Sequence, residues 1–223
     1  MEKGILLEKL LRCIEFGKVS RMAPYPPDLA GEDGADELTR EALDSGIPPA
    51  EILDSALIPA MDRVGLKFSE KKIFVPQMLI SAKAMNAALL HLKPYFQAGE
   101  VKRKGRFIIG TVTGDMHDIG KNLVAMIVEG AGWEVIDLGV DVSSAKFRKA
   151  LSENEGAVVG LSALLTTTMV NMKAIAGEIK RDFPDTRIVI GGAPVNEAFR
   201  VEIGADNYSG DPQALVRYLN SLA

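Results

Sequence analysis

The spacing of apolar residues changes near the middle of the chain. In the first half they recur every three or four positions, as in the stripe that contains Leu6, Leu10 and Ile14. This spacing is typical of the buried face of an α-helix. Three more such stripes follow, and Pro49 and Pro76 stand where the last two begin, in a first turn that tolerates proline. The pattern predicts four helices with short connections, which is a small helical bundle.

One connection in this half is longer than the others. The segment Met22–Gly34 is rich in proline, glycine and acidic residues, so it predicts a loop. It fits either a partner contact or a tolerated surface insertion. A second polar segment, Gln97–Gly105, ends the helical pattern and is typical of a linker between domains.

After this linker, short runs of β-branched residues alternate with helical stretches. The runs span residues 106–112, 133–139, 157–163, 187–192 and 206–210. Alternation at this spacing predicts a parallel, doubly wound sheet. The predicted fold class is therefore α/β: an N-terminal four-helix bundle over residues 1–97, then a flavodoxin-like or Rossmann-like sheet of five parallel strands over residues 105–223. Such sheets bind ligands outside the carboxyl ends of their strands.

Composition excludes several classes of function. Of the 223 residues, 47% are hydrophobic and 25% charged, as in ordinary globular proteins, and the net charge of -4 does not favour nucleic-acid binding. The single cysteine, Cys13, excludes an internal disulfide and a Cys-x-x-Cys metal cluster, and its apolar surroundings predict a buried thiol. Neither a signal sequence nor an apolar run of the roughly 20 residues needed to span a membrane is evident. We expect a cytoplasmic protein without nucleic-acid or membrane partners.

The loop after the first predicted strand carries the most distinctive residues. Asp115 stands two positions before His117, close enough to accept a hydrogen bond from one ring nitrogen and leave the other free for a metal. Gly114 and Gly120 flank the pair and remove side chains where a bulky ligand approaches the backbone. Taken alone, the pattern also fits an N-cap aspartate beside a surface histidine.

Two further strand ends add to the same edge of the sheet. The third strand runs into a series of small and hydroxyl residues between Ser162 and Thr168, and the fourth ends in Gly191 and Gly192. Hydroxyl runs are common helix caps, and paired glycines are common turns. Because the carboxyl ends of parallel strands share one edge, the three loops together predict one pocket.

The order and spacing of these motifs resemble a known signature. The run G-D-M-H-D-I-G-K-N, followed by S-A-L and then by G-G, is similar to the D-x-H-x-x-G, S-x-L, G-G pattern of cobalamin-binding modules. These modules occur in methionine synthase and in the small corrinoid proteins of methyltransferase systems. Residues 64–85 resemble the helical cap of the same module, and the similarity extends from Asp36 to Gly210.

The resemblance implies a cofactor and its ligands. The cofactor is cobalamin or a related corrinoid, bound with its own lower base off cobalt and with His117 on cobalt as the metal ligand. Asp115 is then the hydrogen-bonding partner of His117, and Thr168 stands where methionine synthase has a serine that completes the triad. The other cofactor-binding residues implied are Gly114, Met116, Asp118, Ile119, Gly120 and Leu164 in the two loops, Ser162, Thr166, Gly191, Gly192, Tyr208 and Gly210 around the displaced nucleotide tail, and Phe68, Val75 and Met78 near the methyl-bearing face. For all three of these cap residues, an ordinary place in the bundle core is the alternative.

The implied function is that of a methyl carrier without catalytic residues of its own. Such a protein moves a methyl group on cobalt from a donor-specific methyltransferase to an acceptor methyltransferase, of the tetrahydrofolate or thiol kind, in anaerobic one-carbon metabolism. The sequence contains neither a zinc-ligand cluster nor a phosphate loop, so a separate ATP-dependent reductive activator is expected.

Three alternatives remain at this point. The main one is a B12-dependent sensor or regulatory domain, although such caps usually contain a tryptophan and Trp133 lies outside the predicted bundle. The others are the binding domain of an adenosylcobalamin mutase and a receiver-like signalling domain. The sequence does not identify the methyl donor.

Overall fold

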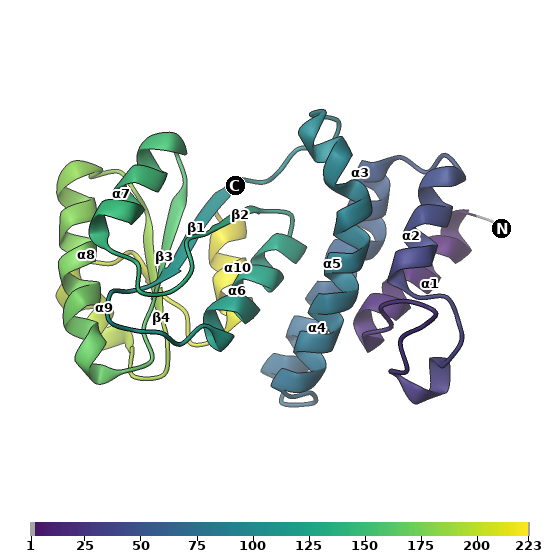
Figure 1. The fold of residues 1–223 in the computed structure, drawn as a ribbon, viewed down its shortest axis with the longest axis horizontal. Helices are drawn as coiled ribbons and strands as arrows, with labels where there is room; N and C mark the ends of the chain where they lie inside the picture. Colours follow the sequence, from purple (N-terminus) through teal and green to yellow (C-terminus); the bar gives the residue numbers. More distant parts are fainter. Residues whose placement is uncertain (1–2, 223) are drawn as a thin grey trace. The chain divides into compact units, whose positions relative to one another are not determined.

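The computed structural model describes residues 3–222, which form two compact units (Figure 1). The first runs to Arg103 and also includes Gly130–Gly132, and the second comprises Lys104–Glu129 and the residues from Trp133 onward. The first unit is helical, as the apolar stripes predict. Its helices are α1 (Lys3–Phe16), α2 (Ala35–Asp44), α3 (Pro49–Ile52), α4 (Ile58–Ser69) and α5 (Val75–Gln97). Among the described residues, no helix is long and apolar enough to cross a membrane.

The third predicted helix consists of α3 and α4, which follow each other without a loop, but the regular α-helical hydrogen bonds are interrupted between them. Between α3 and α4 the chain forms a π-helical turn, Leu53–Leu57, in which the N–H of Ile58 donates to the carbonyl of Leu53. Pro59 follows in the first turn of α4 and has no N–H, so a regular ladder cannot run through this point. The apolar side chains of this stretch nevertheless stay buried, including Leu57, Met61 and Val64.

The segment Met22–Gly34 is a loop, as predicted, with one short 3₁₀ turn (η1, Pro27–Leu29). It is tied to the helices at several points. Lys18 is fully buried, and its Nζ donates a hydrogen bond of 2.8 Å to the carbonyl of Ala23. Arg21 forms an ion pair with Asp33 at 2.6 Å, and its backbone N–H donates to the carboxylate of Glu37 at 3.0 Å. The loop is therefore an ordered part of the helical unit.

The second unit contains a five-stranded sheet. Its strands are β1 (Arg106–Thr111), β2 (Glu134–Asp137), β3 (Val158–Ser162), β4 (Ile188–Gly191) and β5 (Asn207–Tyr208). All neighbouring strands are parallel, in the order β2-β1-β3-β4-β5, which is the flavodoxin-like order. The predicted doubly wound sheet is thus confirmed.

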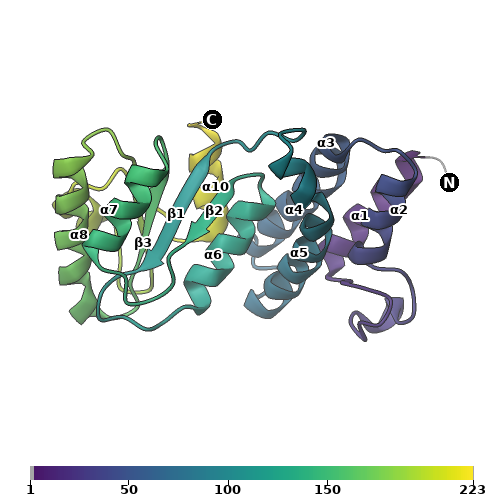
Figure 2. The same cartoon turned by 45° about the horizontal axis from the view of Figure 1, so that its top comes forward.

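Helices cover both faces of this sheet. Figures 1 and 2 show α7 (Ser144–Glu153) and α8 (Met169–Asp182) on one face, and Figure 1 shows α9 (Glu197–Ile203) on the same face. They show α6 (Ile119–Gly130) and α10 (Pro212–Asn220) on the other. Helix α9 begins after Asn196, whose side chain caps it by accepting from the N–H of Phe199 at 3.0 Å.

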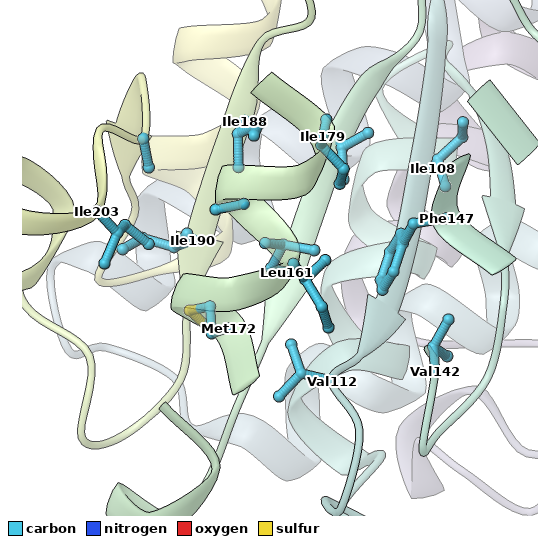
Figure 3. Packing of buried hydrophobic residues seen from close by; sticks show 14 of the residues in the cluster. Ile108, Val112, Val142, Phe147, Leu161, Met172, Ile179, Ile188, Ile190 and Ile203 are labelled. Carbon is cyan, nitrogen blue, oxygen red and sulfur yellow. The ribbon is translucent and has the colours of Figure 1, made fainter. Parts of the chain in front are cut away.

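The apolar core between the sheet and α7, α8 and α9 makes a rigid platform (Figure 3). Strand residues such as Ile108 and Leu161 pack with Phe147 of α7 and Met172 of α8, and none of the four is more than 2% exposed. Burying side chains of this size stabilises a fold by about 1.5 to 3 kcal/mol each. The close fit includes Gly110, where a Cβ atom would lie 2.8 Å from the ring of Phe147. Loops at the carboxyl ends of the strands are therefore held on fixed supports.

Candidate functional site

The candidate site lies where the strand order reverses. From β1 the chain turns outward through α6 to β2, whereas β3 leads through α8 toward β4, so the loops after β1 and β3 diverge at adjacent strand ends. Such a switch point is the usual ligand site of an open α/β sheet. The loop after β1 carries Asp115 and His117, and the loop after β3 carries Leu164, Leu165 and Thr168.

Asp115 links these two loops. It is fully buried, and its Oδ2 accepts hydrogen bonds from the N–H of Leu164 at 2.7 Å and of Leu165 at 3.2 Å. The hydroxyl of Thr168, also buried, lies 2.8 Å from the same oxygen. Burial alone raises the pKa of Asp115, but the hydrogen bonds from Leu164, His117 and Thr168 outweigh it and hold the pKa well below its usual range. Asp115 is therefore a carboxylate that can only accept hydrogen bonds.

His117 is oriented by the other oxygen of this carboxylate. Its Nδ1 lies 2.7 Å from Asp115 Oδ1, and its backbone N–H donates to the same oxygen at 3.1 Å. The hydroxyl of Thr111 donates to the His117 carbonyl at 2.9 Å. Because a carboxylate cannot donate, Nδ1 carries the proton, and the lone pair is on Nε2. The side chain is 50% exposed, so the structure presents an oriented imidazole with a free ligand atom.

Apolar side chains stand exposed around this imidazole. Met116 and Ile119, in or next to the same loop, are 68% and 70% exposed, and Leu164 and Leu165 are 44% and 41% exposed. Large apolar residues gathered in this way mark a binding surface more often than ordinary protein surface. A broad, flat, largely apolar group would cover them.

The glycines of the site are required for different reasons. Gly114 has φ +83°, so the backbone itself requires glycine there. Gly192 has φ +125°, and a Cβ atom would lie 1.8 Å from the carbonyl oxygen of Ala163, so β3 and β4 close too tightly for any side chain. Gly120 has neither feature, since nothing lies within 4 Å of its Cβ position. It leaves open space beside the His117 loop.

The remaining predicted residues fall into two groups. Ser162 is half-buried at the end of β3, in register with Thr111 on one side and Gly191 on the other, so these residues do share one sheet edge. Asp118 and Thr166 are exposed, Tyr208 is half-buried in β5, and Gly210 follows it.

Phe68, Val75 and Met78 belong to the other unit. Phe68 is half-buried, Val75 is exposed in the first turn of α5, and Met78 has no exposed surface. His91, which the apolar stripe of α5 does not explain, pairs with Asp36 at 2.5 Å within the same unit. Cys13 is buried, as predicted.

Sequence reasoning missed three groups that shape the site. The N–H of Leu165 binds Asp115, the carboxylate of Asp141 accepts from Gly114, and the side-chain amide of Asn171 donates to Thr113. A backbone donor leaves no sequence signal. Asp141 was recognisable in principle, because it follows β2, the neighbour of β1, at the same edge of the sheet.

Comparison with known proteins matches this geometry to one family. Two family models, both described as B12 binding domains, match residues 105–215 and residues 31–93. The chain is 38% identical over 183 residues to trimethylamine corrinoid protein 1 of Methanosarcina acetivorans, covering 79% of this chain and 84% of the relative. The chain belongs to the corrinoid proteins of methyltransferase systems. A corrinoid protein of Desulfitobacterium hafniense is 34% identical over 196 residues, covering 86% of this chain and 91% of the relative.

Solved structures of corrinoid proteins share the fold. A cobalamin-binding protein from Desulfitobacterium hafniense matches with a TM-score of 0.73 at 26% identity, covering 100% of this chain and 98% of the other. A chain of the methanol:cobalamin methyltransferase complex MtaBC from Methanosarcina barkeri matches with a TM-score of 0.81 at 26% identity, covering 98% of this chain and 79% of the other. The predicted family and fold class are confirmed.

The donor set of this corrinoid protein fits its cofactor. A corrinoid carries its cobalt inside a macrocycle, so His117 alone, rather than a cage of side chains, would suffice as the ligand from the protein. Around His117 the chain offers one exposed nitrogen, a buried carboxylate that orients it and an apolar rim. The residues present therefore suit a large flat macrocycle.

Proposed function

We propose that this corrinoid protein carries a methyl group on cobalt between a donor-specific methyltransferase and an acceptor methyltransferase of the tetrahydrofolate or thiol kind. Relatives at 36 to 39% identity are named trimethylamine, dimethylamine and monomethylamine corrinoid proteins. The structural neighbour from Methanosarcina barkeri is a chain of the methanol:cobalamin methyltransferase complex MtaBC. The proposal includes an ATP-dependent reductive activator as a further partner and the cytoplasm as the site of action.

The finer proposal concerns how cobalt is held. The cofactor binds with its lower base off and His117 on, and the observation that carries this is the half-exposed imidazole whose Nδ1 is bound to a buried carboxylate. When bound, the corrinoid supplies the centre that accepts and gives up the methyl group. Asp115 fixes the tautomer of His117, and Thr168 with the N–H groups of Leu164 and Leu165 keeps Asp115 ionised.

Other residues take supporting roles in the same proposal. Ser162, Thr166, Gly191 and Gly192 hold the displaced nucleotide tail, with Tyr208 and Gly210 beside it. The tight closure at Gly192 supports this, because it leaves the strand ends without side chains that would obstruct an extended group. The assignment of Phe68, Val75 and Met78 to the methyl-bearing face stays a proposal.

The carrier function is tested with purified, reduced holo-protein. Methanol, trimethylamine and related donors are added with and without a catalytic amount of the cognate donor-specific methyltransferase, and methylation of the corrinoid is followed by absorbance. We expect methylation only when a methyltransferase is present. Rapid methylation by a donor alone would make this chain a methyltransferase itself. Failure with every methyltransferase tried would favour the sensor alternative.

A further inference from the structure

The peptide between Thr113 and Gly114 is held at both of its polar groups by side chains from other segments. The Thr113 carbonyl accepts a hydrogen bond of 2.7 Å from the side-chain amide of Asn171, in the first turn of α8. The Gly114 N–H donates at 2.7 Å to Oδ1 of Asp141, which follows β2. Both distances are at the short end of the range for such bonds. The backbone immediately before Asp115 is thus fixed from two sides.

Asp141 makes a second contact with the same loop. Its own N–H donates to the carbonyl of Asp115 at 3.1 Å, so the two segments exchange hydrogen bonds in both directions. Asp141 has φ +51°, a left-handed conformation that is uncommon for residues other than glycine, asparagine and aspartate. Its exposed carboxylate is directed at the backbone of the His117 loop.

The segment that carries Asp141 is itself anchored independently. Gly139 donates to the carboxylate of Asp137 at 2.8 Å and accepts at its carbonyl from the Thr111 N–H at 3.0 Å. The Val142 N–H donates to the Thr111 carbonyl at 2.9 Å, and Lys146 Nζ donates to the Leu138 carbonyl at 2.7 Å. These bonds do not involve the side chain of Asp141. Removing that side chain therefore leaves the segment after β2 in place.

We propose that Asp141 and Asn171 are positioning residues for His117: they hold the backbone at Thr113 and Gly114 so that the imidazole stays where the corrinoid meets it. This inference rests on the proposed function, because it takes His117 as the ligand of cobalt. The bonds to Asp115 fix its carboxylate, whereas the bonds from Asp141 and Asn171 fix the chain that carries it. Outer partners of this kind hold a ligand in its binding geometry before the metal arrives.

The test compares two substitutions that both tolerate a positive φ. Asp141→Gly removes the acceptor without straining the backbone, and Asp141→Asn keeps a side-chain oxygen in the same place. Both remove the charge, so their difference isolates the hydrogen bond to Gly114. Asn171→Ala removes the other anchor. We expect Asp141→Gly and Asn171→Ala to weaken corrinoid retention by about 10- to 100-fold, with Asp141→Asn close to wild type.

Two further readouts separate positioning from stability. Electron paramagnetic resonance of the Co(II) holo-protein should show the imidazole nitrogen coupling weakened or heterogeneous in Asp141→Gly and restored in Asp141→Asn. The unfolding midpoint of each apo-protein should fall only slightly, and not in proportion to the loss of binding. If Asp141→Gly and Asn171→Ala retain corrinoid and nitrogen coupling like wild type, the positioning role is wrong. A loss of apo-protein stability that parallels the loss of binding would also overturn it, because the residues would then be structural. If wild type itself lacks imidazole coupling, the proposed ligation of cobalt by His117 fails, and the positioning role fails with it.

Discussion

Replacing Asp115 by asparagine should disturb both the stability of the sheet unit and the state of His117. The carboxylate accepts five hydrogen bonds, from the ring and backbone of His117, the backbones of Leu164 and Leu165, and the hydroxyl of Thr168. An asparagine side chain accepts through one oxygen only. Its NH₂ group must therefore face either the two leucine N–H groups or His117.

Each orientation of the amide has a cost that follows from the structure. If the NH₂ group faces Leu164 and Leu165, two N–H donors at 2.7 and 3.2 Å lose their acceptor. An unsatisfied donor costs about 1 to 3 kcal/mol, and both leucines are partly exposed to water, so we expect a loss of about 2 to 4 kcal/mol in the free energy of unfolding. If the NH₂ group faces His117, Nδ1 must accept and Nε2 then carries the proton. The imidazole is no longer ready to bind a metal.

The assay is urea unfolding of the apo-protein together with corrinoid retention on gel filtration. Asp118→Asn is the matched control, because Asp118 lies in the same loop but is exposed, and its carboxylate accepts from the side-chain amide of Asn122 at 3.0 Å. The control should unfold like wild type. If Asp115→Asn also unfolds like wild type and retains corrinoid equally well, then the hydrogen bonds to the Asp115 carboxylate neither stabilise the sheet unit nor prepare His117 for a metal.

Three other perturbations test separate parts of the structure. Gly192→Ala should lower the unfolding midpoint strongly, because the new Cβ would lie 1.8 Å from a backbone oxygen. Gly120→Ala places its Cβ where nothing lies within 4 Å, so it should leave the stability of the apo-protein unchanged and weaken only corrinoid retention. Equal stability of the two variants would contradict this. Burial raises the pKa of Cys13 to about 11, so iodoacetamide should not modify the native protein at pH 8 but should do so in urea, and native labelling would show that the thiol is accessible. Asp206 is half-buried, which alone raises its pKa, but hydrogen bonds from Lys180, Ile188 and Arg187 lower it. The stabilisation from its carboxylate is therefore present above the unfolded pKa and lost as pH falls through the folded pKa. Asp206→Asn should accordingly cost about 1 to 2 kcal/mol at pH 7 in urea unfolding, and this difference should shrink with acidification, whereas a constant difference would exclude the linkage.

Most of the architecture could be predicted from the spacing of apolar residues. Strands buried on both faces and helices with one apolar stripe leave strong patterns. Ser143 and Asp211 cap their helices, and serine and aspartate are residue types that favour this position. The π-helical turn before Pro59 could not be predicted in this way. A proline in a first turn and a proline that forces a π turn look alike in sequence, and hydrogen bonding decides between them.

The candidate site likewise has one part that the sequence predicts and one part that it does not. The Asp115, His117 and Thr168 contacts follow from residue types at strand ends, and the structure brings these side chains together. The role of Gly114 was predicted to be steric, but its positive φ shows a conformational requirement that composition does not reveal. Asp141 and Asn171 act on backbone atoms, and such contacts depend on loop geometry rather than on a motif.

The most direct test of the central claim uses the fact that the chain has only two histidines. Protein labelled with nitrogen-15 at histidine is loaded with unlabelled corrinoid, reduced to Co(II) and examined by electron paramagnetic resonance, with His91→Gln as the control for the histidine paired to Asp36. If His117 is the axial ligand, each cobalt line should change from a nitrogen triplet to a doublet on labelling, in wild type and in His91→Gln alike. A triplet that persists in the labelled protein would show that the base of the cofactor remains on cobalt and would contradict the account.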